Sequence, residues 1–409
     1  GFAALMLPLG GILGIILLTK IAGKVRAYEK FTVPEIIGDR YGSVARILSV
    51  IALVMAYMVI VSYQYNAGGA VLTTVLTDAN GDALISAQTG TIIAAIFIVA
   101  YTMLAGLVSV AYTDVANGIL MTIVLVIAFP IFWIKAGGWS GMEMSFGEMG
   151  KPNHMQFFGV YSGLDILNFC LPPFLLVLGD ANMYQRFFAS KNAEGAKSAT
   201  TVLIFAVAIM ELLIIATAWV SASLIPDAEV GKYVLIYAAH QLLPTFLGAV
   251  MMTTIVGIIL STADSFLLVP ATTLMKDVYL EYINPKVNQK KIVFLSRMLV
   301  LVLGIVAYIV SLGFAKSAGF FERALYAYTI YGAAITPSLV AALFWKGATK
   351  EGAVASILSG TFITLLWKEL PSLWTWVPAH IYGSVEEVLP AISASLFALI
   401  SVSLLTKKN

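Results

Sequence analysis

The chain has 409 residues and a formal net charge of +2 at pH 7; 60% of its residues are apolar and only 11% are charged. Ordinary soluble domains hold about 45–50% apolar and about 25% charged residues, so this composition excludes them and indicates an integral membrane protein in contact with the lipid bilayer. The low net charge argues against nucleic acid as a partner. The single cysteine, Cys170, excludes an intramolecular disulfide.

Apolar segments divide the chain in a regular way. A helix needs about 20 apolar residues to cross a hydrocarbon layer of roughly 30 Å, and eleven segments reach this length, joined by short Gly-, Pro- and Asp-rich connections. No linker or change of composition marks a boundary, so residues 1–409 are expected to form one all-α transmembrane domain. The expected spans are 2–23, 44–76, 88–110, 115–136, 161–184, 197–224, 235–275 (a span with a re-entrant or amphipathic flank), 291–314, 321–345, 350–368 and 387–406.

Positive charge predicts the orientation of these spans. If the connections alternate between the two sides, 18 of the 24 Lys and Arg residues fall on one side. Cytoplasmic loops carry an excess of Lys and Arg, so the C-terminus is expected in the cytoplasm and the protein in the cell (inner) membrane, as a multi-pass protein. Gly1 then lies outside with no signal peptide before it, and at least one further helix is expected upstream of this chain.

The second span contains a group of polar and aromatic residues, 63–66, which read Tyr-Gln-Tyr-Asn. Gln64 is a candidate for lining a solute site, and so are Tyr328 and Tyr331 in the ninth span. The tyrosines could instead belong to the aromatic belt at the membrane interface.

Two carboxylates lie near or within apolar segments. Asp114 follows Thr113 and precedes an apolar run, so it could face an ion path or cap the next helix. Glu211 lies in mid-span of the sixth segment, where an ionisable residue is by default functional. It could be protonated, contact the solute or pair with Arg297, and the sequence does not choose between these.

Pro172 and Pro173 interrupt the fifth span, and Gly179 and Asp180 follow within two turns. Broken helices flank the midplane binding site of many transporters. An ordinary proline kink is the alternative.

The strongest single signal is the run from Leu260 to Ser265 in the seventh span. At 100° per residue, Ser261, Asp264 and Ser265 share one face, with Thr262 at its edge. Polar groups are costly inside a membrane helix and mark ion or substrate paths. An all-oxygen set suits a hard cation such as sodium and no transition metal. Alternatively, the hydroxyls bond the carbonyl four residues back.

Five stretches, spread in order over nearly the whole chain, together resemble the sodium:solute symporter family. Residues 31–42 resemble its T-x-P-(D/E)…R-(F/Y)-G loop, 106–114 its G-G-x-x-A-V-x-W-T-D, 185–192 its Q-R-x-x-A-A-K-(S/N), 261–265 its S-T-x-D-S, and 344–353 its (L/F)-W-K-x-x-T-x-x-G-A.

The resemblance implies an inverted-repeat, five-plus-five helix transporter fold. Residues 2–136 would be the remainder of the first repeat, 161–345 the second repeat and 350–406 two peripheral helices. The N-terminal extra helix and the first core helix would be absent from this chain. The implied function is sodium-coupled secondary active symport, which imports a small organic solute by alternating access, with Na⁺ as coupling ion and no organic cofactor. The solute and the oligomeric state stay open.

The resemblance also implies roles for individual residues. The main sodium site would use the hydroxyls of Ser261 and Thr262 with the Ile258 carbonyl, and Asp114 would join Asp264 and Ser265 in a second cation site. The fifth span resembles the sixth core helix, which makes further residues candidates for lining the solute site: Asn168, Phe174 and Val177.

Other functions find less support. A membrane-embedded enzyme needs a nucleophile with a base, or a metal cluster, and no histidine lies in mid-span. A transporter-like sensor module and a proton-coupled symporter on the same fold are the remaining alternatives.

Overall fold

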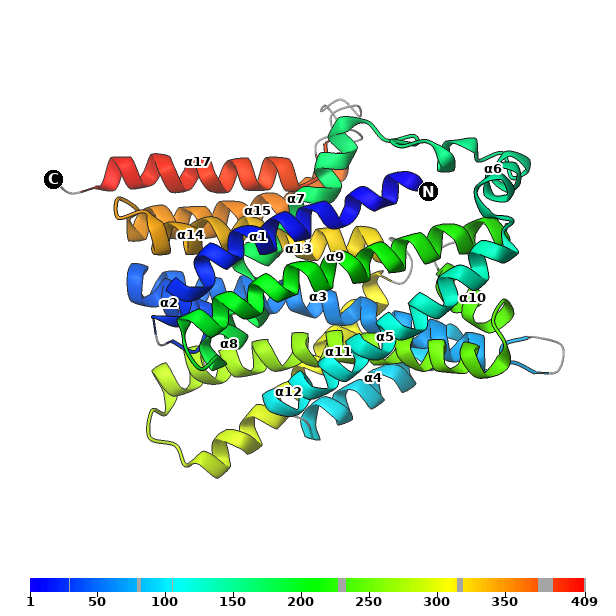
Figure 1. Ribbon diagram of the computed structural model, residues 1–409. Helices are drawn as coiled ribbons and strands as arrows, with labels where there is room; N and C mark the ends of the chain where they lie inside the picture. Colours follow the sequence, from blue (N-terminus) through cyan, green and yellow to red (C-terminus); the bar gives the residue numbers. More distant parts are fainter. Residues whose placement is uncertain are drawn as a thin grey trace.

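Long helices, nearly all running along one common axis, make up the protein (Figure 1). The computed structural model describes residues 1–28, 30–78, 82–104, 106–226, 233–314, 319–373 and 385–407. Within these ranges no β-strand occurs, and an isolated antiparallel bridge joins Thr77 to Ala83.

The described residues of the first part of the chain form four long α-helices, two short α-helices and two 3-10 helices. Its elements are η1 (Phe2–Met6), α1 (Leu7–Arg26), α2 (Val33–Tyr41), α3 (Ser43–Val75), α4 (Ala87–Leu104), α5 (Leu107–Lys135), α6 (Gly138–Glu148) and η2 (Pro152–Met155).

The second part alternates long helices with short or broken ones. Its elements are α7 (Gly163–Gly179), α8 (Ala181–Ala189), α9 (Ala193–Leu224), α10 (Val234–Gln241), α11 (Thr245–Thr273), the π-helix η4 (Leu274–Ile283), α12 (Gln289–Phe314), α13 (Phe320–Ala334), α14 (Thr336–Phe344), α15 (Lys350–Leu373) and α17 (Val388–Thr406).

Ten helical segments of the described residues are long and apolar enough to cross a membrane. They coincide with ten of the eleven predicted spans. The eleventh, 350–368, forms α15, which is not among the ten; its 24 residues extend about 36 Å and pack against α17 and α13. In Figure 1, α2 lies at the same end of the bundle as the C-terminus, and α6 and α10 lie at the other end.

Two of the predicted spans are broken helices. The fifth divides into α7 and α8 at Asp180, and the ninth divides into α13 and α14 at Ile335. The prediction that Pro172 and Pro173 interrupt the fifth span was wrong, because both lie inside α7. The chain breaks only where the Asp180 side chain caps α8 by accepting a hydrogen bond from the amide of Asn182 (3.1 Å).

The loop that resembles the first family motif ties α2 and α3 to η4. Thr32 caps α2 by accepting from the Glu35 amide (3.1 Å), and its hydroxyl donates to Asp277 (2.7 Å). Arg46 binds the other oxygen of Asp277 through Nε (2.7 Å) and Glu281 through Nη1 (2.8 Å). Asp277 is fully buried. A buried, hydrogen-bonded ion pair thus holds this end of the bundle together.

Arg46→Met is expected to destabilise the protein by about 3 kcal/mol or more, because it leaves the Asp277 carboxylate buried without its cation. Thermal unfolding in detergent measures the loss. Lys350→Met is the control, since Lys350 and Glu351 form an exposed pair whose removal costs at most about 1 kcal/mol. Equal melting temperatures for the two variants would contradict a structural role for this pair.

Candidate functional site

Asp114 lies inside α5, seven residues after its first residue. The alternative that it caps a helix is therefore excluded. Its two carboxylate oxygens have separate partners: Ser261 on α11 donates to Oδ1, and Arg186 on α8 donates to Oδ2 (2.7 Å). Asp114 joins three helices that lie far apart in the sequence.

The predicted polar face of α11 points at this junction. Besides Ser261, the hydroxyl of Ser265 accepts a hydrogen bond from the Arg186 guanidinium (3.4 Å). Ser261 bonds a carboxylate of another helix here, so its hydroxyl is directed into the site. The grouping of Ser261, Asp264 and Ser265 by helical periodicity agrees with this geometry.

Two further oxygen groups are available for a ligand. Asp264 is only 1% exposed, and neither of its carboxylate oxygens has a hydrogen-bond partner among the described residues. A buried carboxylate without partners is costly, and it is stabilised by a cation or by a proton. The Thr262 hydroxyl, half-buried one residue after Ser261, makes no hydrogen bond within the described part of the chain.

The Ile258 carbonyl lies one turn before these side chains. α11 is continuous from Thr245 to Thr273, so the carbonyl belongs to an unbroken helix. A carbonyl oxygen has two lone pairs, and the second can still contact an ion that lies beside Ser261 and Thr262.

The charges of this cluster do not balance. Asp114 and Asp264 bring two negative charges and Arg186 one positive charge. One monovalent cation or one proton would neutralise the group. The cluster has the ligand chemistry of a Na⁺ site, with carboxylate and hydroxyl oxygens and no nitrogen or sulfur ligand.

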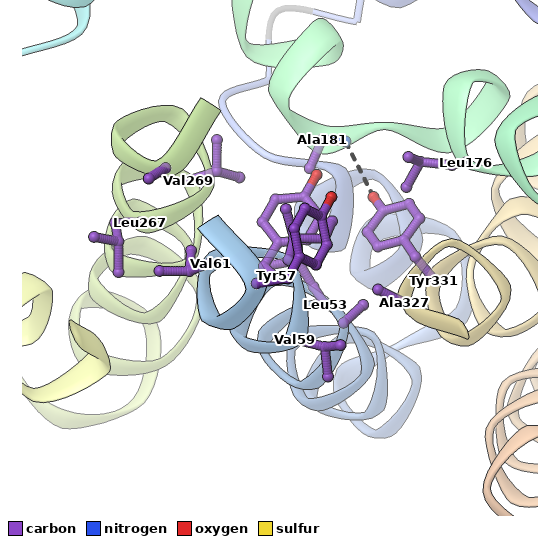
Figure 2. Close-up of a cluster of buried hydrophobic side chains, with 14 of the residues drawn as sticks. Leu53, Tyr57, Val59, Val61, Leu176, Ala181, Leu267, Val269, Ala327 and Tyr331 are labelled. Carbon is purple, nitrogen blue, oxygen red and sulfur yellow. Dashed lines mark hydrogen bonds between the residues drawn. The ribbon is translucent and has the colours of Figure 1, made fainter. Parts of the chain in front are cut away.

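A second group of contacts holds the break between α7 and α8. The Tyr57 hydroxyl of α3 donates to Asp180 (2.5 Å). Tyr331 of α13 donates to the Gly179 carbonyl (2.7 Å) and accepts from the Ala181 amide (3.1 Å). Figure 2 shows the rings of Tyr57 and Tyr331 side by side, next to Ala181; their centroids are 5.5 Å apart. The helix ends freed by the break are thus satisfied by tyrosine hydroxyls.

The two helix breaks touch one another. Thr336, at the start of α14, donates to the Leu175 carbonyl of α7 (2.7 Å). A Cβ atom on Gly179 would lie 2.4 Å from the Thr336 hydroxyl, so only glycine permits this approach. α8 therefore starts at the contact between the broken helices and carries Arg186 to the carboxylate cluster.

The residues predicted to line the solute site lie in separate parts of the structure. Phe174 and Val177 pack against α1 at Gly14. Tyr331 forms hydrogen bonds with the backbone at the break between α7 and α8. Asn168 is 2% exposed, and its side-chain oxygen has no partner among the described residues.

Gln64 and Tyr328 lie beside Tyr63. Glu211, half-buried on α9, is within electrostatic range of the Tyr328 hydroxyl. Arg297 is exposed on α12, and no ion pair joins it to Glu211 in the part of the chain described. The predicted alternative of a Glu211–Arg297 pair is therefore wrong.

The sequence analysis missed Arg186, Tyr57 and Asp180 as site residues. Arg186 stands within the stretch 185–192 that carried the family resemblance, and an unbalanced pair of carboxylates is a signal to look for such a cation. Tyr57 had no such signal, because a tyrosine in an apolar helix is equally typical of packing.

A family model described as sodium:solute symporter family matches residues 1–360. The high-affinity proline transporter PutP of Bacillus subtilis (strain 168) is 26% identical over 95% of this chain and 80% of its own length. The sodium/proline symporter of Staphylococcus aureus is 25% identical over 100% of this chain and 80% of its own length.

Two solved structures share the fold. A Na⁺-coupled sialic acid symporter in a substrate-bound outward-open state has a TM-score of 0.74 at 16% identity, over 98% of this chain and 83% of that one. Mhp1 in its inward-facing conformation has a TM-score of 0.53 at 12% identity, over 99% of this chain and 85% of that one. The predicted inverted-repeat, all-helical transporter fold is confirmed.

Proposed function

The chain belongs to the sodium:solute symporter family, and we propose that it couples Na⁺ entry to the import of proline or a similarly small amino acid. Sodium-coupled symport of a small organic solute follows from the family and the relatives, which are membrane transporters and not enzymes. The choice of proline rests on relatives that are named for it. The observation that carries sodium coupling is the carboxylate and hydroxyl cluster around Asp114.

The energy available from sodium is sufficient. One Na⁺ that moves down about 100 mV gains roughly 2.3 kcal/mol, and a tenfold concentration gradient adds about 1.4 kcal/mol. One ion could therefore support roughly 500-fold accumulation of a neutral solute.

Two neighbouring sodium positions are proposed on α11. The first uses Ser261, Thr262 and the Ile258 carbonyl; its support is the free hydroxyl of Thr262. The second uses Asp114, Asp264 and Ser265 with Ser261; its support is the buried, unpartnered carboxylate of Asp264.

α8 is proposed to link ion binding to the movement of the helices. Arg186 occupies one oxygen of Asp114, so Na⁺ and the guanidinium compete for the same carboxylate. When Na⁺ binds, it weakens the hold of Arg186 on Asp114, and α8 can move about its other end, where Tyr57 and Tyr331 hold Asp180 and its neighbours. Ion occupancy would thereby shift the equilibrium between outward-facing and inward-facing states.

The repeats and the orientation are proposed as the sequence predicts them. Residues 2–136 would contribute to the first repeat, 161–345 would form the second and 350–406 the peripheral helices, with the C-terminus in the cytoplasm. The basic residues at the end of the bundle that carries α2 support this orientation.

The solute is proposed to lie between the broken helices and α3. Gln64, Tyr328 and Glu211 supply polar groups at mid-span, and Glu211 can balance the amine of an amino acid. Asn168 offers an amide oxygen without a partner. Phe174, Val177 and Tyr331 would shape the site through packing.

Asp264 also supports a second candidate function, proton-coupled symport, because a proton can neutralise a buried carboxylate in place of Na⁺. The two candidate functions differ in the ion that drives transport and not in the solute that is transported.

Uptake of labelled proline into proteoliposomes tests both. An inward Na⁺ gradient is expected to drive accumulation, an equal K⁺ gradient is not, and Thr262→Ala is expected to lower the Na⁺-driven rate at least tenfold. Thr253→Ala is the matched control, since that exposed hydroxyl on the same helix bonds the Ala249 carbonyl (2.9 Å). Uptake driven by a pH gradient without Na⁺ would favour proton coupling; the absence of Na⁺-driven uptake both for proline and for other small amino acids would overturn the proposed solute.

A further inference from the structure

α12 carries an exposed cation well inside its span. Arg297 is the ninth residue of the helix, about 12 Å along its axis from the first. Its side chain is exposed, and it has no hydrogen bond or ion pair among the described residues. A lipid-facing guanidinium at this depth is costly unless its charge reaches the interface or an anionic partner.

An apolar groove between α4 and α12 begins one turn beyond Arg297. Its cavity measures about 330 Å³. Gly304 forms part of its floor, where a Cβ atom would lie 2.3 Å from the Val99 side chain, so the two helices meet closely beneath it. Its walls are aliphatic apart from Tyr308 at one end: Ile92, Ala95, Ile96, Ala100, Met103, Leu301 and Ile305 also line it.

The cations and the groove lie on one face of α12. Lys290, Arg297, Leu301, Gly304 and Tyr308 follow at intervals of seven, four, three and four residues, which places them on a single stripe of a helix. Lys290 is exposed at the start of the helix, and Lys286 and Lys291 are exposed beside it. The positively charged side chains therefore lie at one end of the apolar groove.

We propose that this surface binds an anionic phospholipid of the leaflet next to the basic end of the bundle. The phosphate contacts Arg297 and Lys290, and one acyl chain lies in the groove towards Tyr308. The eleven helical steps from Arg297 to Tyr308 extend about 16 Å, most of the length of a lipid acyl chain. Basic clusters next to membrane helices attract anionic lipids. A zwitterionic lipid also has a phosphate and acyl chains, but its own positive group offsets the attraction of the two cations, and a second copy of the chain supplies no acyl chain for the groove.

Native mass spectrometry of the purified protein, titrated with phosphatidylglycerol and with phosphatidylcholine of the same chains, tests the proposal. Each cation near the surface contributes about fivefold to the affinity for an anionic lipid. Arg297→Gln together with Lys290→Gln is therefore expected to weaken phosphatidylglycerol binding about 25-fold and to leave phosphatidylcholine binding unchanged. Arg297→Lys is expected to keep most of the affinity.

Ala100→Phe fills the groove from an exposed position and is expected to weaken phosphatidylglycerol binding with both cations intact. Lys197→Gln and Ala206→Phe on the exposed surface of α9 are the matched controls and should bind like the wild type. Equal binding of the two lipids, or equal losses in the test and control variants, would overturn the proposal. The proposal would also be overturned if free phosphate or dimer formation, and not phosphatidylglycerol, accounted for the observed binding.

Discussion

Asp114→Asn is expected to weaken Na⁺ binding by about 10–150-fold, which corresponds to the roughly 1.5–3 kcal/mol of one charge-assisted contact. Asparagine preserves the shape of the side chain and can still accept from Ser261. It removes one of two negative charges, so Arg186 alone then neutralises Asp264. The cluster no longer favours a further cation.

Sodium-dependent thermal stabilisation measures this loss. A ligand that binds only the folded state adds RT ln(1 + [L]/Kd), about 2.7 kcal/mol at one hundred times Kd. A hundredfold weaker site would leave about 0.4 kcal/mol at the same sodium concentration. Asp39→Asn is the matched control. Asp39 of α2 forms its ion pair with Lys30, which precedes this helix, and both lie away from the cluster. Undiminished stabilisation in Asp114→Asn would exclude this carboxylate as a ligand.

Arg186→Met is expected to have the opposite effect on affinity. Removal of the guanidinium leaves Asp114 and Asp264 with two uncompensated charges, so Na⁺ should bind about tenfold or more tightly. Transport should nevertheless slow down, because the position of α8 then no longer depends on whether Na⁺ occupies the site. A purely structural role for Arg186 would give weaker binding, or unchanged affinity with a lower melting temperature.

Arg26→Met is the control for Arg186→Met. Arg26 donates to the Ser190 carbonyl at the end of α8 (2.8 Å), so its loss disturbs the same helix without changing the charge next to Asp114. Sodium affinity should stay at the wild-type value in this variant. A rise in affinity in both variants would assign the effect to the mobility of α8 and not to charge.

Much of the fold could be predicted because membrane spans are set by local composition. Apolar length alone located ten of the spans. The shared face of Ser261, Asp264 and Ser265 follows from helical periodicity, which is also local.

The errors arose where distant contacts override local signals. For Asp114 the sequence left both an ion path and a helix cap open; partners 72 and 147 residues away satisfy the side chain inside a continuous helix, which removes the cap. The proline pair suggested a break, yet α7 continues to Gly179, where Tyr57, Tyr331 and Thr336 satisfy the backbone and side-chain groups at the break. No pattern within one helix could reveal these partners.

The measurement that tests the account most directly is the sodium affinity of three proteins, taken from thermal unfolding titrated with NaCl against KCl at constant ionic strength. The account predicts a Na⁺-specific stabilisation with affinity highest in Arg186→Met, intermediate in the wild type and lowest in Asp114→Asn. Identical curves in NaCl and KCl for the wild type, or a reversed order of the two variants, would contradict a sodium site in competition with Arg186.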